Sequence, residues 1–130
     1  MSAFSSYLAD KVLNHVLRGQ VFTPPSGLYI ALFTTDPTPG STGTEVSTVG
    51  TGYTRQSISF SVALDQEIKN SNDIEFSGAT SPWGTVTHVG IYDQDAAGNL
   101  LYYGELENPR AIFEGDLLRF STDDLVISIQ

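Results

Sequence analysis

The first residues of the chain repeat their apolar side chains at helical spacing. Phe4, Leu8, Val12 and Val16 recur every four positions, which places them along one side of an α-helix. A serine just before this stripe can cap the first turn, and a glycine after it can end the last one. The pattern predicts an amphipathic helix over residues 5–18.

After residue 26 the pattern becomes typical of strands. Residues 27–34 are apolar on both faces, as expected for a central strand that is covered on two sides. Residues 53–64 alternate apolar and polar side chains, which predicts one long strand. The inner face of that strand would carry Ile58, Phe60, Val62 and Leu64.

Shorter strands are predicted over the rest of the chain. Residues 85–93 and 100–106 flank a polar turn and predict a β-hairpin, with Gly98 and Asn99 at positive φ in the turn. Trp83 precedes this hairpin and is expected to close one end of the core. The other predicted strands cover residues 73–77, 110–113, 117–120 and 125–129. The phenylalanines expected in the core are Phe60, Phe76, Phe113 and Phe120.

Together these segments predict a mainly β fold. We expect an antiparallel β-sandwich or jelly-roll-like domain of about eight strands, with one N-terminal amphipathic α-helix. The helix would occupy residues 1–20 and the sandwich residues 21–130. Residues 35–52 form a long polar loop whose large apolar side chains are Val46 and Val49. A loop of this length is either a mobile surface loop or an arm that becomes ordered on a neighbouring molecule.

The charge composition narrows the range of partners. Six Lys and Arg residues stand against fifteen Asp and Glu residues, for a formal net charge of −9. Nucleic acid and anionic membrane surfaces are bound by clustered cations, so neither is an expected partner. The chain has no cysteine, which excludes disulfides and cysteine catalysis. The longest apolar run, residues 28–33, is far too short to span a bilayer, and we expect no secretory signal peptide.

Candidate catalytic and metal-binding residues are few. His15 and His88 have no second histidine or carboxylate at ligand spacing. Residues 93–99 share only part of the acidic pattern of a calcium loop, so a hairpin turn is the expected role. Glu105 and Glu107 are two positions apart, so they point to the same face of a strand. A glycosidase instead requires two carboxylates that oppose each other across a cleft. The sequence therefore predicts no catalytic residue, no metal site and no cofactor.

Several segments, taken together and in order along nearly the whole chain, carry a family resemblance. They are Tyr7–Leu17, Leu28–Pro37, Gly43–Val46, Gly52–Gln56, Trp83–Asp93 and Gly98–Gly104. The most specific of them reads WGTVTHVGIYD and is followed by GNLLYYG. In these segments the chain resembles a family of small virion proteins of tailed bacteriophages. Members are often labelled tail fibre proteins, and similar small β-sandwich proteins serve as capsid cement or decoration proteins.

The resemblance implies a structural protein that is not an enzyme. The favoured role is a capsid cement or decoration protein, which binds the assembled phage shell and stabilises it. The expected partners are the major capsid protein and further copies of the same chain, as a homodimer or homotrimer. The expected location is the outer capsid surface of the virion, after synthesis in the cytoplasm of the bacterial host.

Two alternatives stay open at this point. A tail fibre or host-surface module would bind tail proteins or host glycans, and would place the protein in the tail. In that case Tyr92, Tyr102, Tyr103 or Trp83 would stack on sugar rings. A hydrolase would depend on His88 together with acidic residues.

The expected partner interface lies on the elements outside the predicted sandwich, which are the helix and the long loop. Two arginines are added because cations are scarce in this chain. The candidate interface residues are Tyr7, Lys11, Asn14, Arg18, Pro37, Glu45, Val46, Val49, Arg55 and Arg110.

Overall fold

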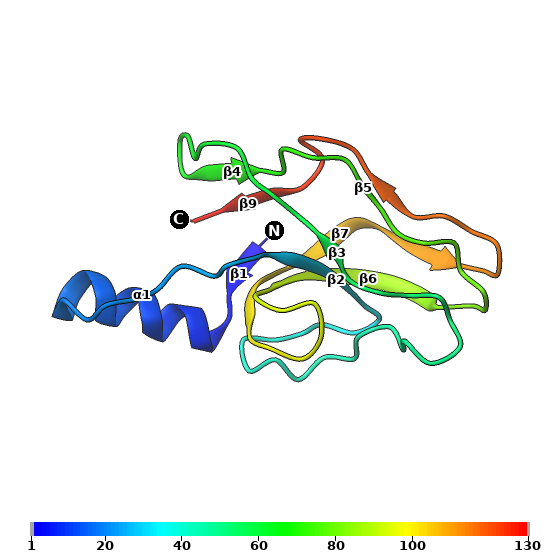
Figure 1. Ribbon diagram of the computed structural model, residues 1–130, viewed down its shortest axis with the longest axis horizontal. Coiled ribbons are helices and arrows are strands. Elements are labelled where there is room, and N and C mark those ends of the chain that lie inside the picture. Colours follow the sequence, from blue (N-terminus) through cyan, green and yellow to red (C-terminus); the bar gives the residue numbers. More distant parts are fainter. Residues whose placement is uncertain (1, 130) are drawn as a thin grey trace.

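The largest element is a five-stranded antiparallel sheet in the order β1-β7-β6-β2-β3 (Figure 1). A computed structural model describes residues 2–129 of the chain. The strands of this main sheet are β1 (Ser2–Phe4), β7 (Leu100–Ile112), β6 (Gly84–Tyr92), β2 (Tyr29–Phe33) and β3 (Gln56–Ser57). β6 and β7 form the predicted hairpin, and β2 lies between β6 and β3 as expected for a central strand.

A second layer is built from two short antiparallel ladders. β4 (Glu67–Lys69) pairs with β9 (Val126–Ser128), and β5 (Ile74–Glu75) pairs with β8 (Arg119–Phe120). The protein is therefore mainly β, with 35% strand and 10% helix, and its sheets are antiparallel. This confirms the predicted fold class, with nine strands among the described residues where about eight were expected.

The main core lies between the two layers. Because side chains alternate along a strand, Ile30 and Leu32 of β2 enter this core, while Ala31 and Phe33 enter a smaller cluster on the opposite face of the main sheet. Burial on both faces explains why the strand residues 30–33 are all apolar. The aromatic residues of the main core include Tyr53, Phe76, Trp83 and Phe120, so the expected burial of the last three is confirmed.

The helix α1 (Ser6–Arg18) begins and ends as predicted. The Ser5 side chain caps it by accepting a hydrogen bond of 3.1 Å from the backbone N–H of Leu8. Gly19 ends it in the left-handed conformation, with φ of 68°. The helix packs against β1 and β7, and Leu8 is its buried residue. Its later turns project away from the sheet (Figure 1).

The long strand predicted over residues 53–64 is wrong. After β3 the segment leaves the main sheet and continues to the second layer, where Phe60 and Leu64 make isolated bridges. Ile58 is buried and Phe60 half-buried, as the alternation predicted. Val62 and Leu64, however, are 89% and 74% exposed, because the segment changes layer and its outer part has no core to face.

Three further predictions need correction near the β6–β7 hairpin and the N-terminus. β7 takes in the separate strand predicted at residues 110–113, and Phe113 after its end is 63% exposed, so it is no core residue. In the hairpin turn Ala97 and Gly98 have positive φ, at 53° and 79°, and Asn99 does not. Strand β1 was not predicted, because three residues carry too little alternation. It joins the N-terminal segment to the main sheet.

Candidate functional site

Arg55 is the centre of a polar cluster that joins two distant loops. Its Nη2 and Nε donate to the two carboxylate oxygens of Glu45, at 2.8 and 2.9 Å. Its Nη1 donates to the carbonyl oxygens of Gln94 and Ala97, at 2.9 and 2.7 Å. The guanidinium carbon lies 3.7 Å from the centre of the Tyr92 ring. Arg55 thus fastens the long loop to the turn of the β6–β7 hairpin.

Tyr53 extends this cluster into the core. Its hydroxyl donates to Glu45 Oε2 at 2.6 Å and accepts a hydrogen bond of 3.0 Å from the backbone N–H of Leu32. Burial of the ring, together with the neighbouring Glu45 carboxylate, raises the pKa of the Tyr53 phenol well above its ordinary value. The phenol stays neutral and acts as a structural hydrogen-bond donor.

Four of the expected interface residues therefore have partners inside the domain. Glu45 and Arg55 bind each other, and Pro37 and Val46 are buried. The loop of residues 35–52 lies against its own sandwich, because Val46 pairs through its backbone with β2 and enters the main core. The loop has no regular alternation of apolar and polar residues from which this packing could have been recognised. Val49 of the same loop is 84% exposed.

The four expected residues on α1 form one polar stripe. Lys11 Nζ lies 5.6 Å from the centre of the Tyr7 ring, and Arg18 Nη1 donates to Asn14 Oδ1 at 3.4 Å. Lys11 and Arg18 are exposed. The structure brings these residues together on the helix, but it does not bring them next to the residues of the long loop that were predicted with them.

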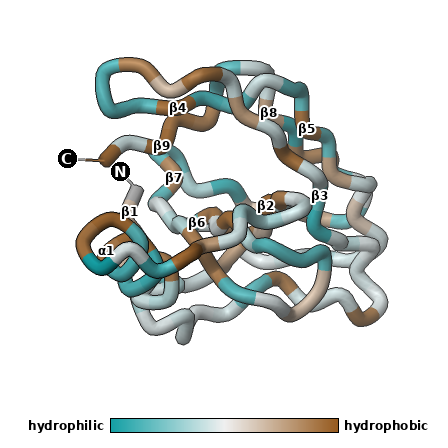
Figure 2. The backbone as a smooth tube through the Cα atoms, turned by 60° about the vertical axis from the view of Figure 1, so that its left-hand side comes forward, coloured by the Kyte–Doolittle hydropathy of each residue, from teal (hydrophilic) through white to brown (hydrophobic). Residues whose placement is uncertain are grey.

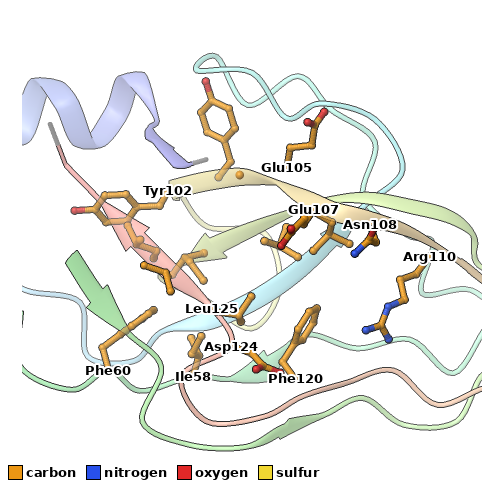
Figure 3. A pocket seen from close by; sticks show the side chains of 17 residues that line it. Ile58, Phe60, Tyr102, Glu105, Glu107, Asn108, Arg110, Phe120, Asp124 and Leu125 are labelled. Atoms are coloured by element: carbon orange, nitrogen blue, oxygen red, sulfur yellow. The ribbon is translucent and has the colours of Figure 1, made fainter. Parts of the chain in front are cut away.

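A groove opens between the main sheet and the β4–β9 ladder, and sequence reasoning missed it. It consists of two adjoining cavities of about 480 and 490 Å³, and both are lined by Phe60, Ile91, Tyr102 and Ile127. Figure 3 looks into the first cavity, where Glu107, Asn108 and Arg110 of β7 stand along one border and Glu105 points to the other side of the strand. Arg110, the last of the expected interface residues, lines this border and is exposed. No sequence pattern marks the groove, because its walls come from segments that are distant in the chain.

The histidines considered for catalysis have few titratable neighbours among the described residues. His88 Nε2 lies 3.8 Å from Glu105 Oε2, and its Nδ1 is 2.8 Å from Thr87 Oγ1. The His88 side chain is 13% exposed, whereas the Glu105 side chain is 73% exposed and open to solvent. Within residues 2–129 no group of three or more His, Asp or Glu side chains is placed to hold a metal ion. His15 contacts the carbonyl oxygen of Gln20 at 2.8 Å, near the end of α1.

The aromatic residues considered for sugar stacking do not share a surface. Trp83 is buried and donates from Nε1 to the carbonyl oxygen of Thr51 at 2.8 Å. Tyr92 is buried beneath Arg55. Tyr102 and Tyr103 are half-buried and belong to clusters on opposite faces of the main sheet. Stacking on one glycan by these four side chains is therefore not supported.

Residues 3–128 match the family described as Podophage GP4 fiber I protein gp80. The chain belongs to this family. The gp80 family match confirms the resemblance to small virion proteins of tailed phages, and it makes the chain a structural protein of a phage virion. A search among curated proteins finds no match. In the part of the gp80-family chain that the structure describes, no helix is long and apolar enough to cross a membrane.

Proposed function

We propose that this protein is a non-enzymatic, fibre-type subunit of the virion that works as part of an assembly. The observation that carries the proposal is the apolar surface at one end of a well-packed domain. Leu13, Val16 and Leu17 on α1 are 55%, 68% and 74% exposed, and the groove opens at the same end. Contiguous exposed apolar surface of this kind marks an interaction site.

The description of the family as a fibre protein supports a place in the fibres of the tail as the first candidate. The partners would be tail proteins, and a host glycan would be bound by surfaces other than the aromatic residues discussed above. The acidic charge of −9 fits a surface that does not adhere to nucleic acid or to anionic membranes.

A capsid cement or decoration protein is the second candidate. The favouring observation is that the described residues form a single two-layer domain without the repeated units of a fibre shaft. A cement protein binds the assembled shell and not its separate subunits, so it would stabilise the shell by mass action. The partner would then be the major capsid protein, on the outer surface of the capsid.

The copy number in purified virions separates these candidates. Quantitative mass spectrometry would measure this protein against the major capsid protein, in whole particles and in separated heads and tails. A few copies that follow the tails would support the fibre. A number comparable to that of the shell subunit, found with the heads, would support cement. Absence from the particle would contradict any structural role in the virion.

A further inference from the structure

Strand β7 carries extra residues where it borders the first cavity of the groove. Between the pairs Val86–Arg110 and His88–Glu105, β6 advances by two residues and β7 by five. Residues 106–109 of β7 therefore form a bulge opposite a single residue of β6. Bulges redirect the side chains that they carry, and they are frequent beside binding and active sites.

The bulge turns polar side chains toward the cavity. In a regular strand, Glu105 and Glu107 would point to the same face. Glu105 instead points to the other side of the strand, where it lies 3.8 Å from His88 (Figure 3). Glu107, Asn108 and Arg110 stand along the border of the cavity. The bulge thus separates two glutamates that the sequence pattern places together, and it gathers three consecutive or nearly consecutive polar side chains on one border.

The polar side chains of this border keep their hydrogen-bonding capacity for a ligand. Within residues 2–129, the side chains of Glu107, Asn108 and Arg110 form no hydrogen bond or ion pair. Asp124, on the opposite wall, uses one carboxylate oxygen, which accepts from the backbone N–H of Ser121 at 2.9 Å. Carboxylates accept hydrogen bonds, arginine donates them and an asparagine amide does both. The cavity therefore offers donors and acceptors together.

The floor of the same cavity is apolar. It contains the rings of Phe60 and Phe120, with Ile58, Val89 and Leu125 beside them. Figure 2 shows the two layers that enclose it, with β8 and β9 in one layer and β6 in the other. The volume of about 480 Å³ lies within the range of about 300–1,000 Å³ that is typical of small-ligand sites. Such a cavity suits a ligand that is apolar on one face and rich in hydrogen-bonding groups at its edge.

The charge of the border limits which ligand fits. The carboxylates of Glu107 and Asp124 outnumber the single guanidinium of Arg110, in a chain whose formal net charge is −9. A phosphate or a carboxylate ligand would be repelled by this field. A sugar ring fits, because its hydroxyl groups both donate and accept hydrogen bonds and its C–H groups pack on aromatic rings.

We propose that the first cavity binds a neutral or amino sugar residue of a glycan. Glu107 and Asp124 accept hydrogen bonds from its hydroxyl groups, Arg110 donates to them, and Asn108 does both. Phe60 and Phe120 pack against the ring. This inference rests on the fibre candidate of the proposed function, in which the protein meets the host surface, and it names the ligand for that role.

The test is a titration of the isotope-labelled protein with small sugars, followed by the NMR chemical shifts of the backbone amides. The neutral probes are methyl glucoside, methyl galactoside and N-acetylglucosamine. Glucosamine is the amino probe and glucuronic acid the acidic one. We expect the amides of residues 105–110 and 120–125 to shift with a neutral or amino sugar, and glucuronic acid to bind more weakly than glucosamine.

Three variants locate the contact on β7. Glu107→Ala should raise the Kd of the sugar that binds by about 10- to 100-fold, because a charged group loses its hydrogen bonds. Asn108→Ala should raise it by about 2- to 10-fold, as expected for a neutral group. Glu105→Ala is the matched control, since this glutamate lies in the same strand and points away from the cavity, and it should leave the Kd unchanged. Thermal unfolding followed by circular dichroism verifies that each variant folds.

Several results would overturn the proposal. The absence of shifts at the cavity with every sugar would do so, and so would equal losses of affinity in the Glu105→Ala and Glu107→Ala variants. A response to hexanol or to a short lysine peptide, with none to the sugars, would assign the cavity to an apolar or a basic partner instead. The copy number in virions tests the structural role separately, so a protein that follows the tails but binds no sugar would keep that role and refute this inference alone.

Discussion

The Arg55–Glu45 pair and the Arg119–Asp73 pair have nearly the same geometry in different surroundings. The shortest N–O distances are 2.8 and 2.9 Å. The side chains of the first pair are 7% and 25% exposed, and those of the second are each 54% exposed. Replacing the arginine by methionine in each pair keeps most of the apolar stem and removes the charge. The two variants therefore isolate the effect of burial on an ion pair.

We expect Arg55→Met to lower the free energy of unfolding by about 3.5–4 kcal/mol. Breaking a buried pair costs about 3–5 kcal/mol because the remaining charge loses its partner, and the partial exposure of Glu45 places this pair near the lower limit. The lost contact with the Tyr92 ring adds about 0.5–1 kcal/mol. By contrast, an exposed pair such as Arg119–Asp73 contributes about 0.2–1 kcal/mol, so Arg119→Met should be nearly neutral.

Urea denaturation at pH 7, followed by tryptophan fluorescence of Trp83, measures both variants. Glu45→Gln, alone and combined with Arg55→Met, completes a double-mutant cycle that gives the coupling energy of the pair. Equal losses in the Arg55 and Arg119 variants, or a coupling energy near zero, would refute the claim that this cluster holds the long loop in place.

Three other variants test further features of the fold. Tyr53→Phe should lower the free energy of unfolding by about 1–3 kcal/mol, because the N–H of Leu32 and the Glu45 carboxylate both lose a hydrogen-bond partner. Because the pKa of the Tyr53 phenol is raised in the folded protein, the wild type should lose stability above pH 10, and the variant should lose less in urea titrations. Hydrogen bonds from Thr122 and the nearby Arg119 lower the pKa of the Asp73 carboxyl. The stability of the wild type should therefore fall as the pH drops below about 4, and urea titrations of Asp73→Asn should show a smaller fall. Gly90→Ala should lower the free energy of unfolding by about 1–3 kcal/mol in the same assay, because the new Cβ would lie 2.8 Å from the Leu100 side chain and 2.9 Å from the Phe33 ring. A neutral result would show that the smaller cluster on the outer face of the main sheet can rearrange to accept a methyl group.

The parts of the fold that could be predicted are those in which local pattern and final environment agree. The helix has its cap, its stripe and its terminal glycine within a few residues, so no distant contact is needed to recognise it. The β6–β7 hairpin has its strands adjacent in sequence. The strand predicted over residues 53–64 is wrong for the opposite reason. Their alternation continues after the segment has left the main sheet, so the pattern persists where the core does not.

The packing of the long loop could not be predicted from the sequence, because the loop is fixed by partners distant in sequence. Arg55 donates to carbonyl oxygens in the turn of residues 93–99, about 40 positions further along the chain. No residue near Arg55 in the sequence indicates this contact. Backbone carbonyls carry no sequence signature, and long-range hydrogen bonds to them cannot be read from residue types. The groove could not be predicted from the sequence for a similar reason. It is a gap between two layers, and each of its walls resembles an ordinary strand face.

The few cations of this acidic chain differ in what they contact. Arg55 and Arg119 bind carboxylates of their own domain, one buried and one exposed. Lys11 and Arg18 contact neutral neighbours on α1, a tyrosine ring and an asparagine oxygen. Both cations lie on the side of the helix opposite to Leu13, Val16 and Leu17, because 100° per residue separates the two groups by about 150°. A partner that covers the apolar face would therefore leave both cations exposed to solvent.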